Sequence, residues 1–188
     1  MGDRARGGEG VAGEPVSRES NRLVDKAIRK ILAPVLRADG FKCSGRTFRR
    51  YRGELVHVFC VGGSRWGGAL HACLGVHLRF LVFPGDLPWT WEKIPEFNCF
   101  LRSALAPGGW RHGEDEASIS AAIQSIRTLY ESQGRDEFDR FSHFPESFTG
   151  IPSDTQMVDP KVLGQFYAAR AKFVFPKLEL HIARLSKS

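Results

Sequence analysis

The spacing of apolar residues predicts two amphipathic helices, one near the start of the chain and one in its second half. Between residues 20 and 40 apolar side chains recur every three or four positions, as one face of a helix requires. This stripe consists of Leu23, Ala27, Ile28, Ile31, Leu32, Val35 and Leu36. Pro34 should kink the helix because it removes a backbone donor, and Gly40 suits the left-handed residue that ends it. A second stripe predicts a helix over residues 115–132, ended by Gly134.

Between these helices the pattern changes from a helical repeat to alternation, which predicts strands. Phe41 to Arg52 is predicted to be an edge-like strand, and Leu55 to Val61 a second strand. After a glycine-rich loop at residues 62–68, alternation from Ala69 to about Phe83 predicts a third strand with one buried and one wetter face. The turn at Gly53-Glu54 and the short connections favour an antiparallel meander.

The later segments are less regular. A short strand or turn is expected around residues 97–105, and further helical stretches over 136–144, 160–175 and 178–185. Together these elements predict an α+β fold, in which helices pack on one face of an antiparallel sheet of about four strands.

The chain is expected to form one domain behind a tail. Residues 1–19 are rich in Gly, Arg and Glu and offer little apolar surface to bury, so we expect a disordered tail there. Residues 20–188 should form a single α+β domain, with residues 145–188 as its helical C-terminal extension.

Composition narrows the class of protein. Apolar residues make up 42% and charged residues 26% of the 188 positions, which excludes a collagen-like or wholly disordered chain. No apolar run approaches the roughly 20 residues of a membrane-spanning helix. The first residues lack the apolar core of a secretory signal, so the expected compartment is the cytosol.

Cysteine spacing agrees with this expectation. Cys43, Cys60, Cys73 and Cys99 lie far apart and form no C-x-x-C pair, the usual mark of a structural zinc site. We therefore expect four reduced thiols, with Cys60 and Cys73 acting as small, partly buried hydrophobic residues.

The net charge of +6 is concentrated in the first third of the chain. Residues 1–53 carry 13 Lys or Arg and 6 Asp or Glu, a net charge of +7, whereas residues 54–188 carry 14 and 15, a net charge of −1. Such asymmetry suits an acidic partner, either nucleic acid or an acidic protein face. A solvated helix face explains it equally well and is the explanation we favour.

Several short motifs occur in an order that resembles a known family. They are Leu36-Arg37-Ala38-Asp39-Gly40-Phe41-Lys42, the pair Phe48 and Arg50, Ser64-Arg65-Trp66, Leu74-Gly75, and Cys99-Phe100-Leu101-Arg102-Ser103-Ala104-Leu105. In this order and spacing, over about residues 20–145, the chain resembles the bacterial domain-of-unknown-function family four-three-zero-four. Family members often carry a glutamine where this chain has Gly62. The resemblance implies the order of the elements and provides no catalytic residues.

Two catalytic motifs can be excluded at the glycine-rich loop. A phosphate-binding P-loop needs Lys and Ser or Thr where Gly68 and Ala69 stand, and it must lead into a helix. A nucleophile elbow at Ser64 would need glycine in place of Trp66. The loop is therefore expected to join two strands, and we assign no catalytic residue and no cofactor to it.

A polar face of the sheet is a candidate metal site. His71, Cys73, His77 and Arg79 alternate along one face of the third strand, and His57 on the neighbouring strand could come near them. However, His71 and His77 are about 20 Å apart along an extended strand, so they cannot share one ion. We favour a polar sheet face covered by a loop or helix, and assign no metal.

Arginines and tryptophan supply the candidate partner contacts. Alternation places Arg46, Phe48, Arg50 and Arg52 on one face of the first strand, and Arg49 and Tyr51 on the other. Such a set can bind phosphates, but it also protects an edge strand from aggregation, which is the explanation we prefer. Arg65 and Trp66 at the hairpin tip have the composition of a protein-binding hot spot.

Three functional hypotheses follow. The leading one is a non-enzymatic protein-interaction module that contacts another protein through Arg50, Arg65 and Trp66. The second is nucleic-acid binding through the basic N-terminal third. The third is an enzyme of unrecognised type that uses His57, His71 or His77 as acid or base. No contact with a membrane is expected, and the sequence leaves the oligomeric state open.

Overall fold

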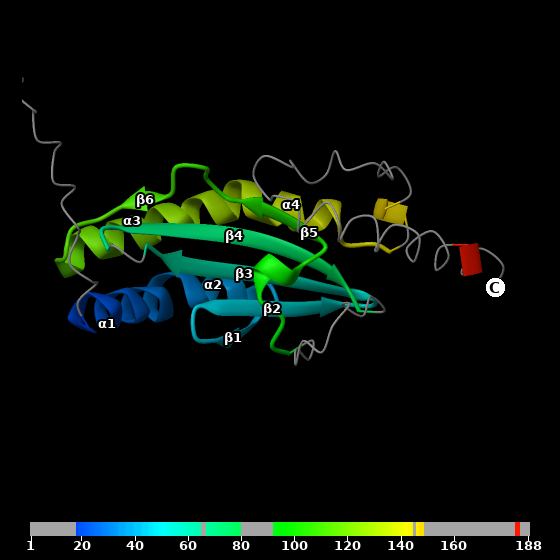
Figure 1. Ribbon diagram of the computed structural model, residues 1–188, viewed down its shortest axis with the longest axis horizontal. Helices are drawn as coiled ribbons and strands as arrows, with labels where there is room; N and C mark the ends of the chain where they lie inside the picture. Colours follow the sequence, from blue (N-terminus) through cyan, green and yellow to red (C-terminus); the bar gives the residue numbers. More distant parts are fainter. Residues whose placement is uncertain (1–17, 65–66, 80–91, 145, 149–182, 185–188) are drawn as a thin grey trace, which may run out of the picture.

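A computed structural model describes residues 18–64, 67–79, 92–144, 146–148 and 183–184. In this part of the chain an antiparallel sheet carries two helical segments on one face, as Figure 1 shows. The strands are β1 Lys42–Ser44, β2 Thr47–Arg52, β3 Leu55–Gly63, β4 Ala69–Leu78, β5 Leu101–Ala104 and β6 Trp110–Arg111. The helical elements are α1 Arg18–Ala27, η1 Ile28–Leu32, α2 Ala33–Ala38, η2 Glu96–Asn98, α3 Glu116–Leu129, η3 Tyr130–Gly134, α4 Arg135–Arg140 and η4 Glu146–Phe148.

The sheet confirms the predicted α+β class and has more strands than expected. Its order is β1-β2-β3-β4-β5, and β6 also pairs with β4. The segment expected to be one strand from Phe41 to Arg52 is a hairpin, because Gly45 adopts a positive φ of 62° and reverses the chain. The third strand ends at Leu78, and residues 80–83 of the expected strand lie outside the described residues.

The first helical segment forms as predicted, with its irregularity at the expected place. Pro34 cannot donate a helical hydrogen bond, and the turn before it widens into a π turn in which Ala33 N–H bonds Ile28 O. At the far end Gly40, with φ 86°, lets Phe41 N–H reach Leu36 O at 2.9 Å, a Schellman closure. The helix begins at Arg18, within the stretch expected to be a tail.

The second helical segment is longer than predicted. Asp115 caps it by accepting a hydrogen bond from Ser118 N–H at 2.8 Å. The prediction that Gly134 ends this helix is wrong, because Gly134 has helical dihedrals inside a π turn and the chain continues into α4. A Cβ at residue 134 would lie 2.8 Å from the ring of Tyr130, so glycine is needed there for close packing. The helical stretch expected over residues 136–144 corresponds to α4, which ends at Arg140.

Register separates the sheet residues into two faces. Phe48, Phe59 and Leu74 are successive cross-strand partners on the helix-covered face, where they join the main hydrophobic core. The opposite face carries Val56 and Val58, which pack with Ile94 and Cys99 from the segment around η2 in a second cluster. The helical stretches expected at 160–175 and 178–185 lie outside the described residues, apart from residues 183–184.

The close approach of η2 to the sheet gives a test of this second cluster. A Cβ on Gly75 would lie 2.6 Å from Cys99 Sγ, so Gly75→Ala should push the η2 segment away and destabilise the fold by about 1–3 kcal/mol. Gly63→Ala is the matched control in β3, because its Cβ would meet nothing nearer than Arg46 at 3.6 Å. Urea unfolding should show a lower midpoint for the first variant alone. Equal midpoints for the two variants would contradict the packing of η2 on Gly75.

Candidate functional site

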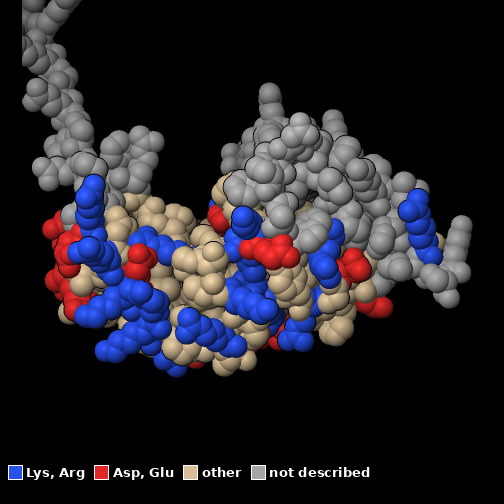
Figure 2. Space-filling view, turned by 90° about the horizontal axis from the view of Figure 1, so that it is seen from below, with Lys and Arg blue, Asp and Glu red and all other residues tan. Residues whose placement is uncertain are grey.

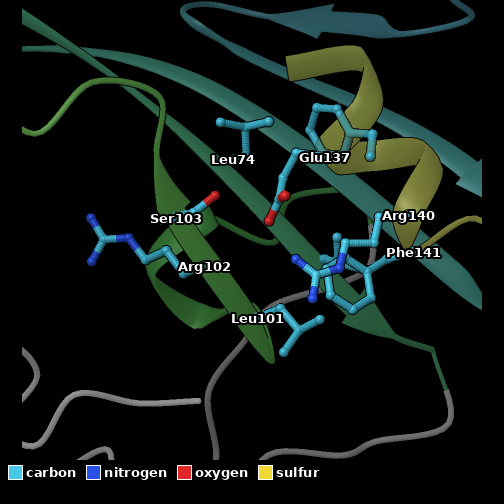
Figure 3. A pocket seen from close by; sticks show the side chains of 9 residues that line it. Leu74, Leu101, Arg102, Ser103, Glu137, Arg140 and Phe141 are labelled. Carbon is cyan, nitrogen blue, oxygen red and sulfur yellow. The ribbon is translucent and has the colours of Figure 1, made fainter. Parts of the chain in front are cut away.

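A groove runs between β5 and the helical segment η3–α4. Two adjoining hollows of about 190 and 220 Å³ share the lining residues Leu74, Ser103 and Glu137, so they form one continuous depression. We call it the β5–α4 groove. Figure 3 shows its first hollow, with β5 on one side and α4 on the other.

The groove has an apolar floor and a polar rim. Leu74 and Val76 of β4 form its floor together with Leu101, Phe138 and Phe141, which are all buried. Polar side chains of both signs line the remainder, and they are Arg102, Ser103, Gln133, Glu137 and Arg140. In Figure 3 the carboxylate of Glu137 points into the hollow, whereas Arg102 points away from it. This mixture suits recognition of an extended chain that has both apolar and charged side chains.

Among the described strands, β5 has a pairing partner on one edge only. It pairs with β4, and no other described strand pairs with it. Leu105 N–H donates to Ala72 O at 2.9 Å, and hydrogen-bonded pairs alternate along antiparallel strands, so Leu101 and Ser103 also face β4. The backbone groups of Arg102 and Ala104 therefore point toward the open edge. A further strand could pair with them there.

The opposite wall of the groove is attached to the sheet through Arg50. This side chain is only 7% exposed and crosses from β2 to two helix ends. Its Nε donates to His57 Nδ1 at 3.0 Å, and its Nη1 donates to Asp39 O at 3.1 Å. Its Nη2 lies 3.5 Å from the carboxylate of Asp139 in α4. The guanidinium also stands over the ring of Phe138, 5.4 Å from the centroid, so polar and aromatic contacts both hold α4 in place.

His57 extends this connection to the end of α4. It is completely buried and stacks on the ring of Phe138 with centroids 5.0 Å apart. Because Nδ1 accepts from Arg50, the ring proton must lie on Nε2, which donates to Phe141 O at 2.9 Å. Burial lowers the pKa of His57 to about 4, so the ring is neutral at physiological pH.

A second, partly buried cluster joins the two helical segments. Tyr130 donates its hydroxyl to Asp39 at 2.7 Å, and Arg135 Nε donates to the same carboxylate oxygen at 2.8 Å. Burial acts to raise the pKa of Asp39, but the bonds from Arg135 and Tyr130 outweigh it and hold the pKa below its usual value. Burial, together with the carboxylate of Asp39, raises the pKa of Tyr130. The ends of α2 and η3 are thus fixed together as a unit.

The predicted histidine set is divided between the two faces of the sheet. His57 pairs in register with Arg50 and Val76 and faces the helices. His71 and His77 pair with Gly62 and Val56 on the opposite face. His77 is buried, whereas His71 is exposed and its ring lies where a Cβ of Gly62 would be. The structure therefore does not bring His57 close to the other two.

The remaining candidate residues are the arginines Arg79, Arg50 and Arg65 and the tryptophan Trp66. Arg79 lies just after β4, where its Nη1 donates to Gly53 O at 3.2 Å and its guanidinium stands 5.9 Å from the ring centroid of Tyr51. Arg50 is part of the buried network rather than of the exposed surface. Arg65 and Trp66 lie outside the described residues.

The four cysteines carry free thiols. Cys60 and Cys73 are cross-strand partners on the face opposite the helices. Burial raises the pKa of the Cys60 thiol to about 11 and also raises that of Cys73, which makes both poor nucleophiles at neutral pH. Within the described part of the chain, no group of three or more His, Cys, Asp and Glu side chains is arranged to hold a metal ion.

Sequence reasoning missed the residues of the groove. Ser103 and Glu137 are far apart in the chain, and only the packing of α4 beside β5 brings them to one depression. The signal for the network was an Arg and a His at cross-strand positions of a predicted hairpin, Arg50 and His57. A register assigned from the turn at residues 53–54 could have paired them.

Comparison with known proteins gives one match. The model of a family described as a domain of unknown function (DUF4304) matches residues 32–140, which include the groove lining from Leu74 to Arg140 and the Arg50–His57 pair. No curated protein and no solved structure matches the chain. None of the helices in the described ranges is both long enough and apolar enough to cross a membrane.

The neutrality of buried His57 predicts a pH dependence of stability. In the unfolded chain the imidazole has its ordinary pKa near 6.5, whereas in the folded chain the pKa is about 4. The unfolded state therefore binds more protons between these values, and stability falls as the pH falls from 6.5 toward 4. This residue alone should reduce the free energy of unfolding by about 2 kcal/mol between about pH 7 and pH 5.

Urea unfolding of the wild type and of His57→Gln at these two pH values measures that contribution. The variant should be less stable at pH 7 and should lose about 2 kcal/mol less than the wild type on acidification. Other titrating groups are common to both proteins, so their effects cancel in the difference. An equal loss in both proteins would show that His57 is not held neutral by the fold.

Proposed function

The chain belongs to the family described as a domain of unknown function (DUF4304), and we propose that this chain is a protein-interaction module whose site is the β5–α4 groove. The observation that carries the proposal is an edge of β5 with which no described strand pairs, next to a depression with an apolar floor. A peptide that adds to a sheet edge gains affinity from backbone hydrogen bonds and specificity from pockets for alternate side chains. In this chain the strand edge of β5 and the hollows that could take side chains lie next to each other.

The expected partner is an extended segment of another protein. If it pairs with Arg102 and Ala104 as a further strand, every second side chain points toward the helix-covered face and into the groove. One apolar side chain would contact the floor formed by Leu74 and Leu101. A basic side chain two positions away would face Glu137, so the preferred segment alternates apolar and basic residues on its inward side.

The buried network supports binding in preference to catalysis. His57 was a candidate acid or base, but both of its ring nitrogens are engaged in hydrogen bonds and the ring has no exposed surface. The network instead stiffens the α4 wall, which lowers the ordering cost of binding. We place this activity in the bacterial cytoplasm, which agrees with the four free thiols.

The loop with Arg65 and Trp66 is a competing contact surface. It was the sequence-based candidate, and its residues Arg65 and Trp66 lie outside the described residues. The peptide-binding measurement that tests the groove therefore also uses the double variant Arg65→Ala, Trp66→Ala. Its behaviour separates binding through the hairpin loop from binding through the groove.

Selection of peptides by the full chain tests the proposal. A random peptide library is panned on the immobilised protein, and enriched peptides are synthesised and measured by fluorescence anisotropy. Ala104→Pro removes the backbone donor that points to the open edge and leaves the bonds to β4 in place, so binding should weaken by about tenfold. Ala104→Val, which keeps the donor and suits a strand, is the matched control and should bind as the wild type does.

Three results would reject the proposal. One is that no peptide is enriched over the bare surface. The second is that Ala104→Pro, with an unchanged urea midpoint, binds the selected peptides as tightly as Ala104→Val does. The third is that the Arg65→Ala, Trp66→Ala variant loses binding while Ala104→Pro retains it, which would assign the site to the hairpin loop.

A further inference from the structure

The first helical segment presents a strongly basic surface that the groove does not explain. Residues 18–52 contain eleven Lys or Arg and three Asp or Glu. The exposed cations of the first helical segment and of β1 are Arg18, Arg22, Lys26, Arg29, Lys30, Arg37 and Lys42, and we call them the basic face. Figure 2 shows many Lys and Arg side chains on the side of the molecule that carries α1 and β1, with acidic side chains at one margin and a few among them.

The acidic residues near this surface are already paired. Glu19 lies 3.9 Å from Arg22, Asp25 bonds Arg46 at 2.6 Å, and Asp39 bonds Arg135 at 2.8 Å. Glu116, from the start of α3, bonds Lys26 at 2.8 Å.

Other cations of the basic face lie outside these ion pairs. Among the described residues, Lys30, Arg37 and Lys42 form no ion pair. Cations without a close ion pair therefore continue from the middle of the helical segment to the first strand, although Lys30 also interacts electrostatically with Glu116.

The cations follow a regular path along the helix. Arg18, Arg22, Lys26 and Lys30 are spaced by four residues, so each side chain is next to one of like charge. Like charges at this spacing destabilise an isolated helix, and an anionic partner relieves that repulsion. Residues 18–38 at about 1.5 Å per residue extend over roughly 30 Å, the length of about nine base pairs.

The absence of aromatic side chains decides which polyanion fits best. Among the described residues the exposed large hydrophobic side chains are Tyr51 and Phe97, and neither belongs to the helical segment. Proteins that bind single-stranded nucleic acid combine basic grooves with aromatic rings on which bases stack. A basic ridge without such rings suits the regularly spaced phosphates of a duplex.

We propose that the basic face binds the phosphate backbone of duplex nucleic acid without reading its base sequence. Phosphate contacts of Lys and Arg position a protein on a duplex but carry no sequence information. The proposal does not depend on peptide binding at the groove, because the two surfaces share no residue. DNA and RNA duplexes offer the same phosphate chemistry, so the test includes both.

Salt-dependent binding to a labelled duplex of mixed sequence tests the proposal. With about four phosphate contacts, the logarithm of affinity should fall with the logarithm of salt concentration with a slope near −4, or about 100-fold between about 50 and 200 mM salt. The double variant Lys30→Gln, Arg37→Gln should reduce the slope to about −2 and weaken binding at low salt by at least tenfold. The measurement is made with DNA and RNA duplexes of the same sequence and with the matching single strand.

A control variant separates a local site from net charge. Lys93→Gln, Arg111→Gln removes the same charge from exposed positions outside the basic face, and it should keep the wild-type slope. The proposal is overturned if both double variants lose affinity equally, if the single strand binds more tightly than either duplex, or if no duplex binds at about 50 mM salt. Binding to vesicles of phosphatidylserine and phosphatidylcholine without binding to any duplex would equally overturn it, in favour of an anionic membrane surface.

Discussion

The hydrogen bond between Arg50 and His57 is the contact on which the arrangement of the domain depends. It joins adjacent strands at a buried position and fixes the imidazole so that its other nitrogen binds the backbone at the end of α4. A buried cation is costly unless its donors are satisfied and its charge is balanced. Arg50 meets this need with an imidazole nitrogen, a backbone carbonyl and the carboxylate of Asp139. The helix end is therefore held where the groove requires a rigid wall.

The same fold presents two surfaces with different chemistry. The groove combines an apolar floor with a strand edge that no described strand pairs with, whereas the basic face is a ridge of positive charge on the first helical segment. The two helical segments are connected by the hydrogen bonds that Tyr130 and Arg135 donate to Asp39. A protein partner and a nucleic acid could thus be held at once by one rigid domain.

The periodicity of the sequence predicted the elements well because it reports burial directly. The alternation of Phe48 and Arg50 with Arg49 and Tyr51 was correctly assigned to two faces of β2. Periodicity within a strand does not reveal register between strands, and a shift of one residue reverses the face. His57 pairs with Val76 rather than with His77, which places it on the other face from the remaining two histidines of that set.

Gly134 was interpreted as a helix end, although glycine is needed there for close contact with Tyr130, a reason that only packing reveals. The groove depends on contacts between distant segments, so no local pattern could predict it.

The most direct test of the central contact is the protonation state of His57, observed by long-range proton–nitrogen correlation NMR of the imidazole rings. The account predicts that His57 carries its proton on Nε2 alone at neutral pH and stays in that form when the pH is lowered to about 5.5, because its pKa in the fold is about 4. A proton on Nδ1, or titration of this ring near the ordinary imidazole pKa of about 6.5, would contradict it.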